Sequence, residues 1–140
     1  MITLKQPRRW AGAALVVTAA ALALTACGDD SGGSDADTAV VTIRVIDEEY
    51  RIELVTPESI ENARMLLDGE EAPSIPNGLV VRDGDGGVNE PWTWHIDPAS
   101  LEWADATTEV CDGLPSDVED NTITSDRYCP WSAEVIAVDD

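Results

Sequence analysis

The sequence is poor in several residue types that common functions require. It has no phenylalanine, one histidine (His95) and one lysine (Lys5), and its 8 basic residues face 28 acidic ones, for a formal net charge of −20 at pH 7. Because nucleic acids and anionic lipid headgroups carry phosphate, this negative charge argues against both as partners. It suits a basic protein or peptide, although solubility alone is a sufficient reason for an acidic surface.

Long apolar runs are missing as well. Ala11 to Leu24 carries no charge and follows the cations Lys5, Arg8 and Arg9, but a membrane-spanning helix needs about 20 apolar residues. The run ends in Leu24-Thr25-Ala26-Cys27, and an acidic, glycine-rich stretch follows. This motif resembles the lipobox of bacterial lipoproteins, in which signal peptidase II cleaves before the cysteine and the thiol carries a diacylglycerol.

The resemblance implies that residues 1–26 are a lipoprotein signal peptide and that Cys27 is the lipidated first residue of the mature chain. Residues 27–38 are then a flexible acidic tether. Residues 39–140 form a single extracytoplasmic domain, which the lipid anchor holds on the outer face of the bacterial cytoplasmic membrane. An ordinary secretory signal and an N-terminal membrane anchor are the alternatives. Without residues 1–26, the chain has five arginines, no lysine and all 28 acidic residues, a formal charge of −23.

Cysteine is scarce after the predicted cleavage site. Only Cys111 and Cys129 follow Cys27. Two cysteines in an exported domain predict a disulfide rather than a metal site or a thiol nucleophile. Closing this loop would stabilise the domain by about 3 kcal/mol. With one histidine and no free thiol, a zinc site is not expected, and no cofactor is predicted.

The first half of the domain has clear periodicity. Alternating apolar residues predict strands at 40–46 and 50–54, joined by a short polar turn as an antiparallel hairpin. A helix is predicted over 57–68, because Thr56 suits the N-cap and Pro57 the first helical position. The predicted buried stripe of this helix consists of Ile60, Ala63, Leu66 and Leu67.

Shorter elements are predicted in the second half: a turn at Asn77-Gly78, strands at 79–82, 108–110 and 133–138, and a short helix near 116–122. Together, the elements predict an α+β domain. It consists of an antiparallel β-sheet of about five or six strands, one main helix, one short helix and one disulfide.

Four phrases of the sequence together resemble one small domain family: Tyr50-Arg51-Ile52-Glu53-Leu54 before Thr56-Pro57, Trp92-Thr93-Trp94-His95 before Asp97-Pro98, Glu109-Val110-Cys111-Asp112, and Cys129-Pro130-Trp131. They resemble the BP-seventy-four N-terminal domain family over residues 43–138. Similar domains occur in secreted and lipid-anchored bacterial proteins. The resemblance supports the domain boundary and the disulfide, and it implies no particular activity.

His95 is the candidate catalytic residue. In a hydrolase it would act as a general base that Asp97, Glu109 or Asp112 orients. The alternative is a structural histidine whose ring nitrogens satisfy backbone groups beside packed tryptophans. No serine lies in a nucleophile elbow, and both domain cysteines are predicted to be oxidised. A non-enzymatic role is therefore favoured.

Trp92, Trp94 and His95 are the candidate binding residues, and Trp103 and Trp131 could line the same groove for a peptide or a sugar. Alternatively, the tryptophans fill the core in place of the absent phenylalanines. In either case, an exposed tryptophan would be the best indication of a binding site.

Two further hypotheses concern loops. Asp83, Asp85, Asn89 and Glu90 offer oxygen ligands for calcium, but their spacing does not fit an EF-hand, and a flexible hairpin turn is favoured. The loop from Cys111 to Cys129 could present a rigid segment to a protease, as inhibitors do, or simply stabilise a small core. The favoured function is a lipid-anchored binding or interaction module, with a hydrolase and a protease inhibitor as alternatives.

Overall fold

The structure, a computed structural model, describes residues 37–140. The predicted signal peptide, the predicted lipidation site Cys27 and residues 27–36 of the predicted tether lie outside this range. Within residues 37–140, no helix combines the length and the apolar character of a membrane span.

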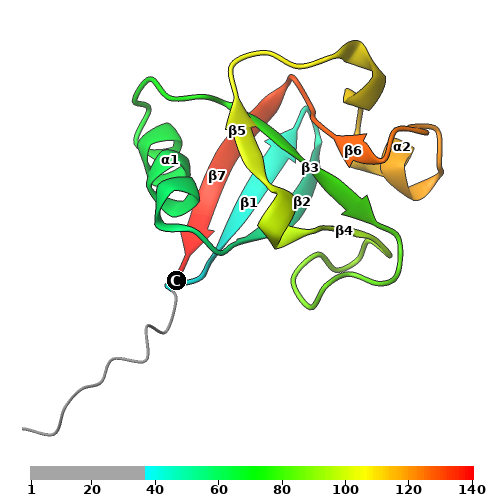
Figure 1. The fold of residues 1–140 in the computed structure, drawn as a ribbon, viewed down its shortest axis with the longest axis horizontal. Coiled ribbons are helices and arrows are strands. Elements are labelled where there is room, and N and C mark those ends of the chain that lie inside the picture. Colours follow the sequence, from blue (N-terminus) through cyan, green and yellow to red (C-terminus); the bar gives the residue numbers. More distant parts are fainter. Residues whose placement is uncertain (1–36) are drawn as a thin grey trace, which may run out of the picture. The chain divides into compact units, whose positions relative to one another are not determined.

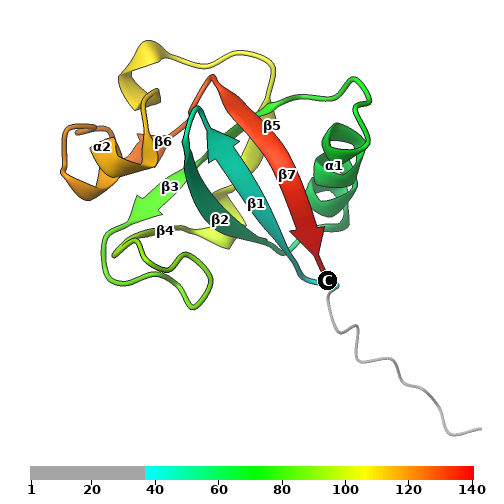
Figure 2. The same cartoon turned by 180° about the vertical axis from the view of Figure 1, so that it is seen from behind.

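A three-stranded antiparallel sheet contains both ends of the described chain (Figure 1). Its central strand β1 (Ala39–Val45) pairs with β2 (Glu48–Leu54) on one side and with β7 (Ala133–Asp139) on the other. The pairing of Val45 with Glu48 confirms the predicted hairpin. Figure 2 shows these strands from behind, where no helix crosses them.

The second sheet is built around β3 (Ile75–Val81). Its antiparallel partners are short: β5 (Glu102–Ala104) near its start, β6 (Arg127–Tyr128) in the middle and β4 (His95–Ile96) at its end. The α+β class and the antiparallel pairing are confirmed. In the described residues, the seven strands form two sheets.

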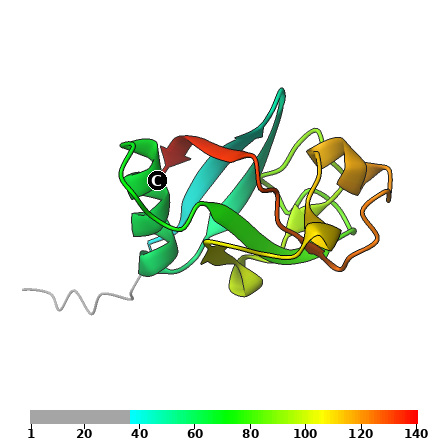
Figure 3. The ribbon, with the colours of Figure 1, turned by 90° about the horizontal axis from the view of Figure 1, so that it is seen from above.

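The helix α1 (Pro57–Leu67) confirms the predicted main helix. Thr56 Oγ1 accepts the Ser59 N–H at 3.2 Å as an N-cap, and Gly69 takes the left-handed conformation (φ 77°) that ends the helix. Ile60 and Ala63 are buried, but Leu67 at the last turn is exposed, which corrects its predicted burial. The short helix α2 (Pro115–Glu119) lies on the opposite side of the domain from α1 (Figure 3).

One aromatic cluster occupies the core in place of phenylalanine. The rings of Tyr50, Trp94 and Tyr128 lie with centroids 5.3 to 5.7 Å apart, and all three side chains are buried. Centroid distances in this range are typical of favourable aromatic pairs. The inward residues of β1 and β2 pack against this cluster.

The structure corrects two predictions of local structure. Asn77 and Gly78 lie inside strand β3 and not in a turn, because Gly78 leaves room for Ile96 and a Cβ atom there would overlap Cγ2 of Ile96. The segment before Cys111 is a 3-10 helix, η2 (Glu109–Cys111), and not a strand. Its Val110 side chain is 72% exposed.

Candidate functional site

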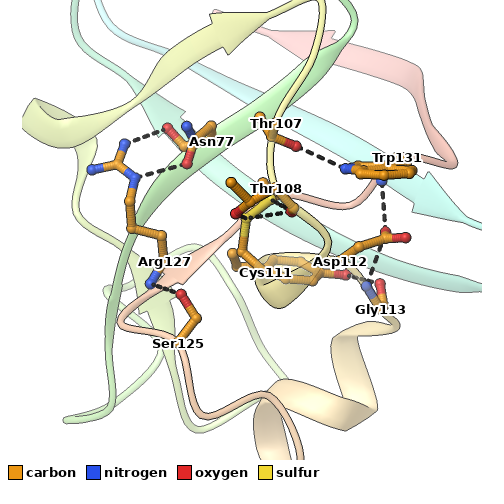
Figure 4. Close-up of a disulfide and its surroundings, with 11 residues drawn as sticks. Asn77, Thr107, Thr108, Cys111, Asp112, Gly113, Ser125, Arg127 and Trp131 are labelled. Atoms are coloured by element: carbon orange, nitrogen blue, oxygen red, sulfur yellow. Dashed lines mark hydrogen bonds between the residues drawn. A yellow bond between two sulfur atoms is a disulfide. The ribbon is translucent and has the colours of Figure 1, made fainter.

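The disulfide joins two segments that are distant in sequence. Cys111, at the end of η2, is bonded to Cys129, which follows β6, with the Cα atoms 5.1 Å apart (Figure 4). The Cys129 N–H also donates to the Cys111 carbonyl at 2.8 Å. Both cysteines are buried. The predicted disulfide is therefore confirmed, and it fixes the start of the segment that leads into β7.

Trp131 follows this disulfide by two residues and is the tryptophan with the most exposed side chain in the described chain, at 44%. Its indole Nε1–H donates to Thr107 Oγ1 at 2.8 Å, and its backbone N–H donates to Asp112 Oδ1 at 2.8 Å (Figure 4). Asp112 Oδ1 also accepts the Gly113 N–H at 2.9 Å. An exposed aromatic ring is thus held in one orientation, which lowers the entropy lost when a partner packs on it.

Trp131 forms one wall of a surface hollow of about 250 Å³, together with Ile75, Asp105, Ala106 and Thr107. A second hollow, of about 600 Å³, shares Asp105 with the first. Its lining consists of Leu66 at the end of α1, the loop residues 70–74 and Asp105. The two hollows therefore adjoin along the segment that leaves β5.

The acidic surface of the described chain is little compensated by its own cations. Four of its five arginines are engaged within the domain. Arg44 and Arg64 pair with the carboxylates of Glu134 and Asp140, which are the only salt bridges within residues 37–140. The other two donate to carbonyl oxygens: Arg82 to Val118 and Ile123, and Arg127 to Asn77 and Ser100.

His95 has a structural environment. Its Nδ1–H donates to the Gly84 carbonyl at 2.8 Å, and its ring packs against Gly86, where a Cβ atom would lie 2.6 Å from ring Cγ. Within residues 37–140, no hydrogen bond joins His95 to a carboxylate. The contacts described for the ring are therefore with backbone groups.

Of the three carboxylates proposed to orient His95, two have other hydrogen-bond partners. Asp97 Oδ1 accepts the Ala99 N–H at 3.1 Å and caps the 3-10 helix η1 (Pro98–Ser100). Asp112 binds the Trp131 backbone, and Glu109 lies on η2 near the disulfide. None of these contacts joins His95 to Asp97, Glu109 or Asp112.

The four candidate calcium ligands belong to an ordered loop. Asn89 is fully buried. Both polar atoms of its side chain are hydrogen-bonded: Oδ1 accepts the Arg51 N–H and Nδ2 donates to the Trp94 carbonyl, each at 2.8 Å. Asp85 Oδ1 accepts the Gly87 N–H, while Asp83 and Glu90 are exposed. In the described part of the chain, no three acidic, histidine or cysteine residues are grouped as metal ligands would be.

Of the predicted binding residues, Trp94 belongs to the core. Its side chain is 1% exposed, so it cannot contact a partner at the surface. Trp92 is half-buried, and its Nε1–H donates to the Glu49 carbonyl at 2.8 Å. Of the three predicted binding residues, only Trp92 and His95 are therefore available to a surface site.

The segment between the two cysteines is folded against the domain. It contains α2 and β6, and Val118 and Ile123 are buried side chains in it. Arg82 donates to the carbonyls of both of these residues. A protease-inhibitor loop would need an extended, protruding segment, so this packing argues against that alternative.

Sequence reasoning considered Trp131 only as one of four tryptophans that could line a groove. The contacts that set it apart, to Thr107 and Asp112, join residues up to 24 positions away. Asp105 and Thr107 carried no motif that could have identified them. The one available signal was the position of Trp131 directly after Cys129-Pro130, where a disulfide restricts the backbone.

Comparisons with known proteins identify a family. Neither the curated proteins nor the solved structures contain a match to this sequence. The family model of the BP-seventy-four N-terminal domain matches residues 36–140, which covers the whole described chain. The chain therefore belongs to the BP-seventy-four N-terminal domain family.

Proposed function

We propose that this chain is a lipid-anchored extracytoplasmic protein whose folded domain binds a basic protein or peptide without catalysing a reaction. The anchor would be Cys27, and the domain would act on the outer face of the cytoplasmic membrane. Membership of the family is consistent with a non-enzymatic module.

The contacts of the candidate catalytic groups support a binding role. Cys111 and Cys129 are bonded to each other, so neither offers a thiolate. His95 donates a hydrogen bond to the Gly84 carbonyl, and Asp112 accepts one from the Trp131 N–H. His95 and Asp112 are thus hydrogen-bonded to backbone groups and not to each other, whereas acid–base catalysis requires the base and its orienting carboxylate to be in contact.

The observation that carries the proposal is the uncompensated charge of the domain. Four of the five arginines are engaged internally, and only Glu134 and Asp140 are paired in salt bridges within residues 37–140. The remaining carboxylates produce a negative potential that attracts basic partners and repels acidic ones.

The test uses the mature protein purified from its membrane in detergent. It is titrated with an arginine-rich peptide that contains leucine residues, at increasing salt concentration. As a matched control, every arginine of the peptide is replaced by glutamate. We expect binding of the basic peptide, with an affinity that falls as salt screens the charges, and no binding of the control. Failure to bind the basic peptide at low salt would contradict the proposal.

The anchor has a separate test. Two acyl chains give stable attachment, whereas a single chain binds membranes only marginally. The native protein should therefore remain in the membrane fraction, and its mass should correspond to residues 27–140 plus the lipid. The variant Cys27→Ser should keep the leader and carry no lipid. An unmodified Cys27 in the native protein would exclude the anchor.

A further inference from the structure

We infer that the two adjoining hollows form one groove for an extended basic segment, with a cationic side chain stacked on Trp131 and its charge facing Asp105. This inference rests on the proposed function and assigns it to a site. The groove is defined by Leu66, the loop residues 70–75, residues 105–107 and Trp131.

The sheet places the two long walls of the groove side by side. Ile75, the first residue of β3, pairs with Ala104, the last residue of β5. The loop that enters β3 and the segment that leaves β5 therefore meet at the same end of the sheet. Asp105, directly after this pair, lines both hollows. An extended segment that crosses from one hollow to the other must pass this carboxylate.

Trp131 supplies the anchoring surface at one end. Its indole is fixed by Thr107, and its backbone is fixed by Asp112 and the nearby disulfide. A guanidinium or ammonium group over the face of an indole is attracted by the ring, and Arg also stacks well on such a face. A rigid, exposed tryptophan is also the residue type most often found at the energetic centre of interfaces.

The charge of the lining selects the occupant. Among the described residues that line the two hollows, Glu70, Glu71 and Asp105 are acidic, and none is basic. A second copy of this chain would bring the same excess of negative charge, and the segment before residue 37 contains only acidic charges after Cys27. Both would be repelled, whereas a basic segment of another protein is attracted.

The groove lies at a free end of the domain. Val45 pairs with Ala133 at the end of the first sheet that is next to Trp131, while Val40 pairs with Asp139 at the opposite end. The described chain therefore begins at the end of this sheet remote from Ala133 and Trp131, and Figure 1 shows β1 starting beside the C-terminal end of β7. The groove therefore lies at the other end of the first sheet from the start of the described chain.

The test repeats the titration with the arginine-rich peptide on variants of the purified mature protein. Trp131→Ala should weaken binding about tenfold or more, as expected for an interface anchor. Asp105→Asn should weaken it about threefold through the loss of one nearby charge. The matched control is Asp126→Asn, which removes one negative charge from another exposed residue. The Asp126 carbonyl accepts a hydrogen bond from the Val80 N–H, so this residue lies at the other end of β3 from the groove.

The outcomes separate this inference from the proposed function. Weak binding by the first two variants with normal binding by the control supports the groove. Three results would overturn the groove while the proposed function stands. They are wild-type affinity in Trp131→Ala, equal losses of affinity in Asp105→Asn and Asp126→Asn, and displacement of the peptide by a neutral oligosaccharide. No binding by the wild type would overturn both. If Trp131→Ala fails to fold, Thr107→Val, which releases the indole, and Asp105→Asn decide the question.

Discussion

The side-chain amide of Asn89 donates a hydrogen bond to the carbonyl of Trp94 at 2.8 Å. Because Asn89 Oδ1 also accepts the Arg51 N–H, this buried side chain joins the loop before β4 to strand β2. The loop is therefore attached to the core next to the aromatic cluster. This contact gives the acidic, glycine-rich segment a structural role that needs no metal.

Replacing Asn89 should destabilise the domain. Asn89→Ala leaves the Arg51 N–H and the Trp94 carbonyl without their hydrogen-bond partner. This loss should lower the free energy of unfolding by about 2 kcal/mol. Urea unfolding followed by tryptophan fluorescence measures the change. Asp83→Ala, an exposed position in the same loop, is the control and should change the free energy by less than about 0.5 kcal/mol. Equal effects of the two changes would show that Asn89 does not hold the loop.

Gly78 and Gly69 should respond to alanine for different reasons. A Cβ atom at Gly78 overlaps Ile96, so Gly78→Ala requires repacking and should cost about 1–3 kcal/mol. A Cβ atom at Gly69 would meet nothing within 4 Å, but the φ of 77° disfavours a side chain, so Gly69→Ala should cost about 1 kcal/mol. Calorimetric melting of both variants compares them. A neutral Gly78→Ala would mean that β3 and β4 do not pack as closely as described.

The two tyrosines predict a loss of stability at high pH. Burial raises the pKa of Tyr50 well above its usual value of 10.0. Burial raises the pKa of Tyr128 likewise, with a smaller contribution from nearby negative charges, and the Tyr128 hydroxyl donates to the Gly113 carbonyl. The unfolded chain releases these protons at a pH of about 10. The stabilisation is therefore complete below that pH and is lost as pH rises above it.

Absorbance of the tyrosinate ion, recorded beside far-ultraviolet circular dichroism, measures this coupling. Both tyrosines of the protein lie in the cluster, so the signal has no exposed contribution. We expect tyrosinate to appear only together with unfolding. Titration of one tyrosine at the usual pKa in a folded protein would contradict the buried cluster.

Removal of the disulfide should affect both stability and the groove. The double variant Cys111→Ser, Cys129→Ser opens a loop with a sequence separation of 18 and should cost about 3 kcal/mol. If the variant still folds, the backbone before Trp131 is less restricted, so peptide affinity should fall as well. Chemical unfolding and the peptide titration measure the two effects. A variant with full stability would show that the bond adds nothing to the fold.

The parts of the fold that sequence could predict depend on local patterns. The hairpin follows from alternating apolar residues, the helix from Thr56 and Pro57, and the disulfide from the number of cysteines. The turn prediction at Asn77-Gly78 was wrong because distant residues decide the matter: Arg127 Nε donates to Asn77 Oδ1 at 2.7 Å, and Ile96 occupies the space beside Gly78.

The candidate site was less predictable for the same reason. Composition indicates that tryptophans must fill the core, but it does not tell which one stays at the surface. Trp94 packs against Tyr50 of β2 and Tyr128 of β6, whereas Trp131 is held at the surface by Thr107 and Asp112. Such contacts depend on the pairing of β3 with β5 and on the disulfide, and no local pattern encodes them.

The indole N–H signals of the mature protein test the central claim most directly. Four of the five tryptophans follow Cys27, so a nitrogen-15 spectrum of the lipid-free domain, released by proteolysis of the tether, should contain four such signals. Trp131→Phe identifies the signal of Trp131. On titration with the arginine-rich peptide, we expect the Trp131 signal to shift most and the Trp94 signal to stay nearly unchanged. The largest shift at Trp92, or no shift at all, would contradict the account.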